Sequence, residues 1–524
     1  MSQRALVITI AALALVALAL RVVRLDERPP HTDEAINAWL LGSVLAGEPF
    51  AFDPRDRHGP LLPAAGLVVA TILGRRSFAE LDERTIRLAP AIVGAAATGL
   101  FLFGAGMVPN GVLAGSAALW ALSPLPLYYA RYAIHETLLV AATLAFLLML
   151  ARAIHAEVAQ ARVLWAIGAG LAAGAMLAAK LSALIPLGAA CVALMAVGRP
   201  LAGGRAVHTS ETSVRKQTAR GPNTVLSVGV PCVLAAALAT TFAYSWGFTR
   251  FAGLHDLVFG LEAPLSRAAG EGHEKGPFYF ASILGTGAGG VVFLVTAALG
   301  AWVAWRRGGA IGRGLVVYTI VLIGVHSAIP YKTPWLALGL FLPLATLAAW
   351  AIAWALEAGM PCRGIRVGPL NQREVLADAS ARRPYPRAAA WLGLTAFAAL
   401  TAHADHRLVF ADPAAETNPF AYAHTSPDLV RLEPFVAGLP AREPLIAVCL
   451  DDPWPLPFLL RHHARVGYWQ PGQALPESAD LVITTSDHAT SLDARFASWR
   501  PHFFMQRPGV MLVALQAPEV AATP

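Results

Sequence analysis

The chain has 524 residues, of which 56% are hydrophobic and only 14% are Asp, Glu, Lys or Arg. Because charged residues make up about a quarter of an ordinary soluble protein, this composition argues against one soluble core and predicts a polytopic membrane domain. The net charge of +7 does not indicate nucleic-acid binding, since the basic residues lie between apolar runs without an aromatic-basic motif. The four cysteines show no CxxC spacing, which argues against a cysteine-based zinc site.

The first predicted element is an apolar run at residues 5–23. As a helix with a rise of about 1.5 Å per residue, it is long enough to cross a hydrocarbon core of about 30 Å. A cleaved signal peptide would begin in a similar way, but no small-residue cleavage site precedes Arg21 and Arg24. We therefore expect a retained span with its N-terminus inside.

A long polar loop at 24–87 follows, and we expect it to face outward. Its acidic pair, Asp33 and Glu34, comes about ten residues after the first span. One interpretation is a helix cap, in which Thr32 or Asp33 satisfies free amides and Glu34 suits the helix dipole. The other is a base, because a carboxylate ionised at neutral pH can accept a proton from a hydroxyl. The two interpretations are compatible, since a cap holds a carboxylate in a fixed direction.

The same loop holds two semi-apolar stretches, 34–47 and 61–74, that predict interfacial helices rather than spans. Between them lies a turn at 53–60 that contains His58. Asp and Pro favour turns, so a structured polar turn explains this segment, and so does a histidine that reaches substrate across the interface.

The rest of the first 404 residues predicts further spans, which brings the total to about eleven. The apolar runs lie at 88–106, 111–128, 137–151, 163–179, 181–198, 225–246, 279–304, 314–330, 334–357 and 388–404. Basic residues gather at 152–162, 199–220, 306–313 and 363–387, as expected for inner loops under the positive-inside rule. An odd number of spans that starts inside places the C-terminal part of the chain outside.

Other predicted outer turns carry candidate binding residues. Arg131 follows two tyrosines, where a guanidinium can anchor the helix at the interface or hold a phosphate in bidentate fashion. His135 and Glu136 could form half of a cation site with Asp33 or Glu34. Lys180 stands alone between apolar runs, where a lysine most often anchors a helix at the interface. Lys332 follows Tyr331 in a turn bracketed by prolines, which predicts a cation held at the level of the lipid headgroups and suited to a lipid phosphate.

The character of the chain changes at about residue 405. Short strand-like runs at 445–450, 481–485 and 510–515 alternate with polar stretches, and a helix is expected near 456–464. We predict a small outer α/β domain at 405–524, following a membrane domain at 1–404.

Several of these segments together resemble the GT-C glycosyltransferases. The segments are HTDEAINAW, RHGPLL, SPLPLYYARYAIHET, IPYKTPWLALG, YAHTSPDL and WPLPFLLRHHARVGYW. They look most like the flippase-activity-associated, glycosyltransferase-39-like branch, relatives of dolichyl-phosphate-mannose protein mannosyltransferases. In that branch the acid before the fourth span is often Asp after Asn, whereas this chain has Glu136 after His135. The signature WWDYG is absent from the sequence, which argues against transfer of a preassembled glycan to asparagine.

The resemblance implies a mainly helical GT-C membrane domain that transfers a sugar from a polyprenyl-phosphate-linked donor to a hydroxyl of a glycan or protein acceptor. Transfer would occur on the outer face of the cytoplasmic membrane, with inversion. The implied catalytic residues are Asp33, as the base, and Glu34. The residues implied for substrate or phosphate binding are His58, Arg131, Lys180, Tyr331 and Lys332. No cofactor is certain, and a divalent cation at His135 and Glu136 stays open.

Two other functions are compatible with the sequence. A flippase, or a partner of one, would bind the same lipid-linked glycan without transferring sugar. A secondary transporter would place its acids within broken and repeated helices, whereas here they gather in outer loops.

Overall fold

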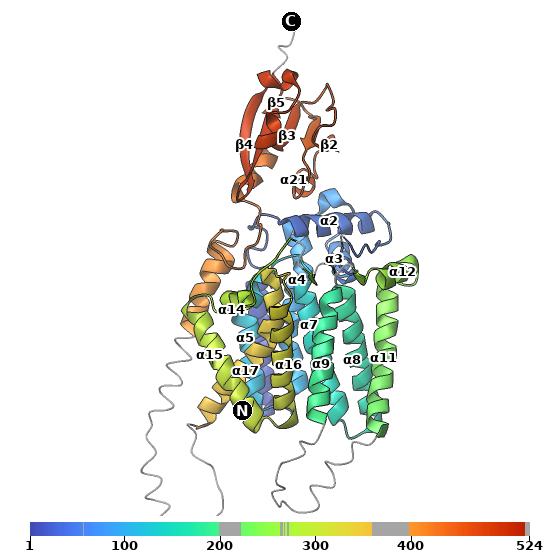
Figure 1. Cartoon of the computed structure of the whole chain (residues 1–524), viewed down its shortest axis with the longest axis vertical. Helices are drawn as coiled ribbons and strands as arrows, with labels where there is room; N and C mark the ends of the chain where they lie inside the picture. The colour runs from blue at the N-terminus through green and yellow to red at the C-terminus, as the bar shows by residue number, and fades with distance from the viewer. Residues whose placement is uncertain are drawn as a thin grey trace, which may run out of the picture.

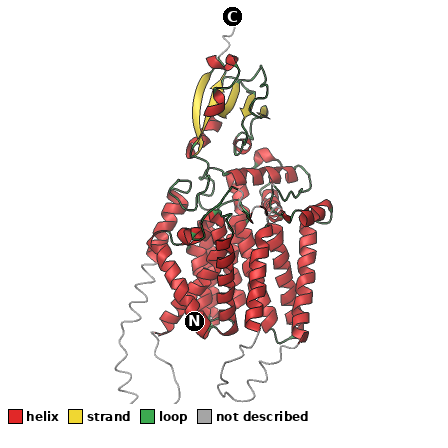
Figure 2. Cartoon of the chain, viewed as in Figure 1, coloured by secondary structure: helices red, strands yellow, loops and turns green. Residues whose placement is uncertain are grey.

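The computed structural model describes residues 1–55, 57–198, 222–262, 266, 268–269, 272–358 and 398–518. Over these ranges the chain forms a bundle of long helices with a small sheet-containing domain at one end (Figures 1 and 2). We call the end of the bundle that carries the sheet the domain end. The basic segments at 199–220 and 363–387 lie outside the described residues.

Eight helices within the described ranges are long and apolar enough to cross a membrane, so the bundle is a multi-pass membrane domain. They are α1 (Gln3–Val22), α4 (Glu83–Leu100), α7 (Glu136–His155), α8 (Ala159–Ala179), α11 (Pro222–Tyr244), α15 (Gly287–Arg307), α16 (Gly309–Ala328) and α17 (Ala337–Ala358). A ninth span results if the bent pair α5 (Asn110–Leu122) and α6 (Pro124–Ala130) counts as one.

The predicted count of eleven spans is not confirmed. The run at 111–128 bends by 55° where α6 begins, because Pro124 has no N–H to continue the hydrogen bonds of α5. The run at 181–198 holds only a 15-residue helix, α9 (Leu184–Gly198), which is shorter than the roughly 20 residues of a full span. Of the predicted run at 388–404, residues 388–397 lie outside the described ranges.

Basic residues mark the end of the bundle opposite the sheet. Arg152 lies in the last turn of α7, and Arg306 and Arg307 lie in the last turn of α15. Both helices run away from the domain end (Figure 1). The positive-inside rule gives this distribution to a bundle whose domain end faces outward, and the outward orientation stays a prediction.

Helix α8 packs closely on α11. A Cβ on Gly170 would lie 2.2 Å from the carbonyl oxygen of Cys232, and a Cβ on Gly174 would lie 2.5 Å from the Cβ of Ala239 and 3.0 Å from the carbonyl oxygen of Ala236. Glycines four residues apart therefore let the two backbones approach, as in other membrane helix pairs.

Two shorter helices of the first loop lie at the domain end. They cover most of the stretches 34–47 and 61–74, for which interfacial helices were predicted. Helix α2 (Thr32–Leu45) lies across the end of the bundle, and α3 (Leu61–Ile72) lies beside it (Figure 1). The small side chains of Ala35 and Ala38 are fully buried in one apolar cluster with Leu41. This face of α2 is therefore fixed between the bundle and the domain above it.

The C-terminal domain contains a five-stranded mixed sheet of order β2-β1-β3-β5-β4. The strands are β1 (Ile446–Cys449), β2 (Val466–Trp469), β3 (Leu481–Thr485), β4 (Arg500–Arg507) and β5 (Val510–Gln516). Strand β1 pairs in parallel with β2 and β3, whereas β5 pairs antiparallel with β3 and β4. Apolar clusters cover both faces of the sheet. The predicted strands at 445–450, 481–485 and 510–515 correspond to β1, β3 and β5.

The sheet domain docks on α2 through a short helix, α21 (Leu456–Leu459). Phe458 of α21 is fully buried in the cluster of Ala35 and Leu81. The Thr425 hydroxyl, in the segment that leads into the domain, donates to the carbonyl oxygen of Pro30 at 2.6 Å. The C-terminal part of the chain therefore contacts both α2 and the residues just before it.

Candidate active site

The start of α2 is held by a capping box. The His31 ring accepts the Asp33 N–H through Nδ1 at 3.0 Å, and a Glu34 carboxylate oxygen accepts the His31 N–H at 3.1 Å. The cap is therefore His31, not Thr32 or Asp33. Because Nδ1 accepts, the ring proton belongs on Nε2, which lies 2.9 Å from the Tyr422 carbonyl oxygen and donates to it. The Asp33 carboxylate is not needed for the cap.

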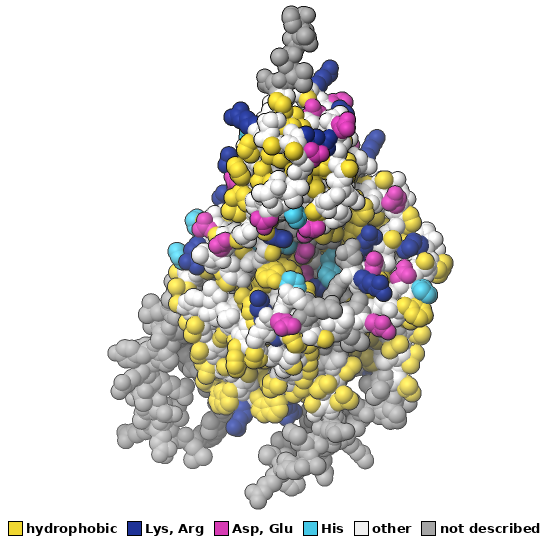
Figure 3. All heavy atoms as spheres, turned by 45° about the horizontal axis from the view of Figure 1, so that its top comes forward, with side chains coloured by type: hydrophobic (Ala, Val, Ile, Leu, Met, Phe, Trp, Pro, Cys, Tyr) yellow, Lys and Arg dark blue, Asp and Glu magenta, His cyan; other side chains and the backbone are white. Residues whose placement is uncertain are grey.

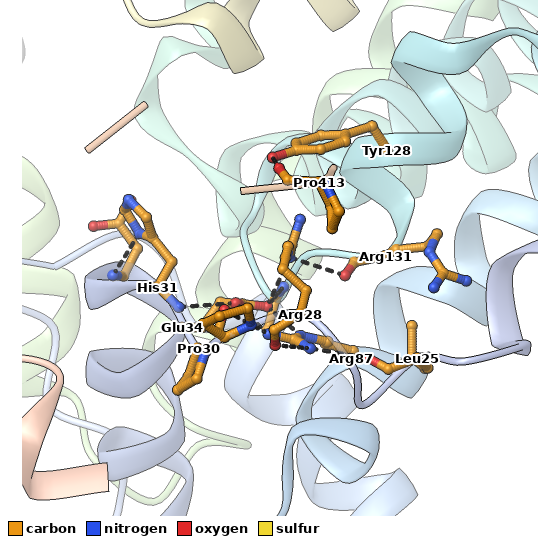
Figure 4. Close-up of polar contacts among 12 residues, drawn as sticks. Leu25, Arg28, Pro30, His31, Glu34, Arg87, Tyr128, Arg131 and Pro413 are labelled. Carbon is orange, nitrogen blue, oxygen red and sulfur yellow. Dashed lines mark hydrogen bonds and ion pairs between the residues drawn. The ribbon is translucent and has the colours of Figure 1, made fainter. Parts of the chain in front are cut away.

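Glu34 lies at the centre of a buried ionic network (Figure 4). Arg87 donates to both carboxylate oxygens, at 2.7 and 2.8 Å, and Arg28 donates to one of them at 3.3 Å. The Ala133 N–H adds a further bond at 2.9 Å. Burial alone would raise the pKa of Glu34, but the charges of Arg87 and Arg28 outweigh it and hold the pKa well below its usual value. Both oxygens of Glu34 are thus fully engaged.

Asp33, the neighbour of Glu34, faces a polar cavity of about 250 Å³ beneath the sheet domain. Figure 3 shows acidic, basic and histidine side chains around a hollow at this junction, while the bundle below is mostly apolar. The Asp33 carboxylate makes no hydrogen bond or ion pair with any residue that the structure describes. The predicted site residues that line the cavity with it are His58, His135, Glu136, Lys180 and Tyr331. The fold thus brings together five segments that lie far apart in the sequence.

An ion pair stands where this polar cavity meets an apolar one. Lys180, directly after α8, donates to Glu136 at the start of α7 at 2.6 Å. Both side chains also line a second cavity of about 160 Å³, whose other walls are mainly apolar side chains of α7, α16 and α17. His58, Tyr331 and Trp335 line both cavities too. The two cavities are therefore adjacent chambers with cationic and polar groups at their boundary.

His135 and Glu136 offer an incomplete site for a divalent cation. The His135 ring lies 5.0 Å from that of His58, centroid to centroid. Burial, and next the charge of Lys180, lower the pKa of His135 to about 3, so the ring is neutral. The Glu136 carboxylate, however, is already paired with Lys180. Across the described ranges no three His, Cys, Asp or Glu side chains gather closely enough to hold a metal ion.

Arg131 and Lys332 lie away from both cavities. The Arg131 guanidinium donates to the carbonyl oxygens at the end of α1, which are those of Leu20, Arg21, Val23 and Arg24, at 2.6 to 3.2 Å. The Lys332 ammonium is 1% exposed and donates to the carbonyl oxygens of Lys275, Ser327 and Ile329. Burial lowers the pKa of Lys332. Each cation therefore stabilises a helix end or loop, where carbonyl dipoles favour positive charge.

Other residues at the site were not singled out from the sequence. Arg28 and Arg87 hold Glu34, and His31 caps α2. Tyr422 and Arg507 line the polar cavity from the C-terminal part of the chain. An arginine such as Arg87, only four residues inside an apolar helix, is a usable signal, because a buried charge in a span needs a partner.

Comparisons with known proteins identify the fold. No family model matches the sequence, and a search of the curated proteins found no match. Among solved structures, ArnT from Cupriavidus metallidurans bound to undecaprenyl phosphate is 17% identical, with 96% of this chain and 97% of that chain aligned at a TM-score of 0.60. The archaeal oligosaccharyltransferase AglB from Archaeoglobus fulgidus, in complex with an inhibitory peptide and a dolichol-phosphate, is 14% identical, with 98% and 74% aligned at a TM-score of 0.54. Similarity at this level shows the fold alone.

Proposed function

We propose, from the premise that this chain has the GT-C fold, that it is a membrane glycosyltransferase. It takes a sugar from a polyprenyl-phosphate-linked donor and transfers it to an acceptor hydroxyl, on the outward face of the cytoplasmic membrane. The observation that carries the proposal is the Asp33 carboxylate, which has no partner in the described chain and faces a polar cavity joined to an apolar one. Both neighbouring structures hold a polyprenyl phosphate, which supports the class of donor.

The two cavities suit the two parts of such a donor. The apolar chamber between α7, α16 and α17 accepts the isoprenoid, and the boundary holds the phosphate. Lys180 supplies positive charge there, with His58 and Tyr331 beside it. Arg131 and Lys332 are bound to backbone carbonyls, so we assign them to holding the scaffold rather than to direct phosphate contact.

The proposed step is a single displacement. The acceptor oxygen forms a bond to the anomeric carbon while its proton passes to an oxygen of Asp33. The bond from that carbon to the phosphate oxygen breaks, and its electron pair leaves with the polyprenyl phosphate. The charge of Lys180 stabilises the leaving phosphate, a contribution of about 3–4 kcal/mol in comparable sites. Because no enzyme nucleophile intervenes, the anomeric configuration inverts.

Glu34 acts in this proposal as a positioning residue. Its oxygens are taken up by Arg87, Arg28 and two backbone N–H groups. It therefore has no free lone pair aimed at a substrate, but it determines where α2 begins. Since Asp33 precedes it directly in the first turn of α2, the direction of the Asp33 carboxylate depends on this network.

A flippase remains the second candidate because a third cavity, of about 220 Å³, extends the chain of cavities toward the opposite end of the bundle. It shares Tyr318 and Leu342 with the apolar chamber. Its lining is almost wholly apolar, however, and a desolvated sugar or phosphate would pay several kcal/mol to pass. This cavity suits a hydrocarbon tail better than a moving headgroup, so transfer is the better-supported function.

The experiment that tests the proposal is mass spectrometry of lipid and glycan pools in cells that lack the protein and are complemented with variants. Wild type should restore a missing sugar on an acceptor and remove accumulated donor. Asp33→Asn should do neither, while Asp26→Asn, an exposed residue earlier in the same loop, should behave as wild type. Full complementation by Asp33→Asn would refute transfer by Asp33 and favour the flippase.

A further inference from the structure

A second polar cavity lies at the domain end, behind the Glu34 network. It has a volume of about 430 Å³ and is formed where α1 ends. Its lining includes Arg24, Arg28, Arg131, Glu27 and Asp412, together with apolar side chains at 409, 410 and 430. None of these residues lines the Asp33 cavity, so the two sites are separate.

The cavity is rich in positive charge that the described residues balance only in part. Arg28 and Arg131 are 7% and 8% exposed. Arg28 must share Glu34 with Arg87, so two guanidinium groups face one carboxylate. Arg131 makes no ion pair among the described residues and donates only to backbone carbonyls. Buried charge without a counter-charge is costly, and an anion in this cavity would reduce that cost.

The pKa of Arg131 reflects the same shortage of negative charge. Burial, and next the positive charge of Arg28, lower the pKa of Arg131 to about 10. The guanidinium nevertheless stays charged at neutral pH. In Figure 4, Arg28 lies between Glu34 on one side and Tyr128 and Pro413 on the other. Tyr128 and Pro413 both line the cavity.

The position of the cavity indicates what kind of anion would enter. Arg24 follows the last residue of α1, Val22, by two positions, so the cavity lies at the level where a span leaves the hydrocarbon. The exposed Val430 and the partly buried Phe410 lie beside the arginines. A phosphate with an attached apolar chain matches this lining, whereas a free phosphate would use only its polar part.

We propose that this cavity, lined at the end of α1 by Arg24 and Arg28, binds the phosphate headgroup of an anionic lipid. Arg131, whose guanidinium is bound to backbone carbonyls, contributes its positive charge to the cavity rather than a direct contact. The site is distinct from the donor site, and its occupant is not consumed. Through Arg28 the bound phosphate adds negative charge to the network that holds Glu34 and the start of α2. Anionic lipid should therefore stabilise the protein whether or not the transferase proposal is correct.

The test uses the full chain in nanodiscs of phosphatidylcholine, with or without phosphatidylglycerol. Two variants weaken the site without touching the Glu34 network. Arg24→Gln removes a lining charge and leaves its partner Glu27 unpaired. Ala414→Glu places a carboxylate in the partly exposed lining turn. The matched controls are Arg500→Gln, at an exposed arginine of the sheet domain, and Ala441→Glu, at a partly exposed loop alanine.

We expect phosphatidylglycerol to raise the thermal midpoint of wild type and of both controls, and to be retained by them in native mass spectrometry. Each lining variant should bind the lipid about tenfold more weakly, as for one lost hydrogen bond to a charged group. Equal stabilisation of wild type, Arg24→Gln and Ala414→Glu would overturn the proposal, and so would the absence of any lipid effect. A separate arm with millimolar inorganic phosphate identifies the source. An equal, Ala414→Glu-sensitive effect of phosphate would overturn the lipid assignment in favour of a soluble anion.

Discussion

Asp33 and Glu34 are neighbouring carboxylates in the first turn of α2, and we expect their substitution to have very different effects on stability. Among the described residues, Glu34 is the only carboxylate that pairs with Arg87, and both side chains are fully buried, so Glu34→Gln removes this pair. It also leaves Arg28 without its ion pair. Removing one partner of a buried pair typically costs about 3–5 kcal/mol, because the remaining charge is uncompensated. We expect a loss of that size in the free energy of unfolding, and with it a loss of activity. Asp33→Asn, which breaks no contact within the described structure, should change that free energy by about 0.5 kcal/mol or less.

The assay is denaturant unfolding of the purified variants in mixed micelles, followed by tryptophan fluorescence. A double-mutant cycle with Arg87→Gln isolates the pair, and we expect a coupling of about 1–3 kcal/mol. If Glu34→Gln costs less than about 1 kcal/mol while sugar transfer is abolished, Glu34 takes part in the chemistry and the positioning role is wrong. A large loss for Asp33→Asn would equally contradict the geometry, because it would mean that Asp33 holds the fold.

Three further outcomes follow from the same contacts. Lys180→Met should weaken donor binding by about ten- to a hundredfold, as for a lost charge-assisted bond. Lys332→Met should lower stability and leave donor affinity unchanged. Equal effects of the two variants on donor affinity, measured by titration, would contradict the assignment. The pKa of Glu34 is held below its unfolded value of 4.5, so its stabilisation is complete above that pH and is lost as pH falls toward the folded pKa; denaturation midpoints between pH 7 and pH 3 should show an acid-sensitive component that is missing in Glu34→Gln. Phe458→Ala should cost about 3–5 kcal/mol at the junction of α2 and the sheet domain, detectable as faster proteolysis of that domain, and unchanged cleavage would argue against the docking contact.

Hydropathy and local motifs were enough to predict the fold class. The GT-C fold expected from the resemblance is confirmed by the structural neighbours. The apolar runs correctly indicated the long helices, and the mostly apolar central strands β1, β3 and β5 were recognised. Strands β2 and β4 were missed because both lie at sheet edges. Edge strands face water on one side, and β4 carries Arg500, Pro501 and His502, so neither shows an apolar pattern.

The site was harder to predict because side-chain direction depends on distant contacts. Arg87 and Glu34 lie 53 residues apart, and no local pattern pairs them. Arg131 carries the charge that a phosphate site needs, yet its guanidinium turns to the end of α1. The sequence indicates which residue types lie at the domain end. Whether each side chain contacts a carbonyl oxygen, pairs with a carboxylate or faces a cavity depends on how several helices pack together.

The central claim is that Asp33 accepts the acceptor proton after the donor has bound. The most direct measurement is single-turnover transfer from a labelled polyprenyl-phosphate sugar, with donor affinity determined on the same purified sample. Asp33→Asn should bind the donor as wild type does and transfer its sugar about 10²–10⁴ times more slowly, while Asp26→Asn transfers at the wild-type rate. Transfer by Asp33→Asn at the wild-type rate would contradict the account.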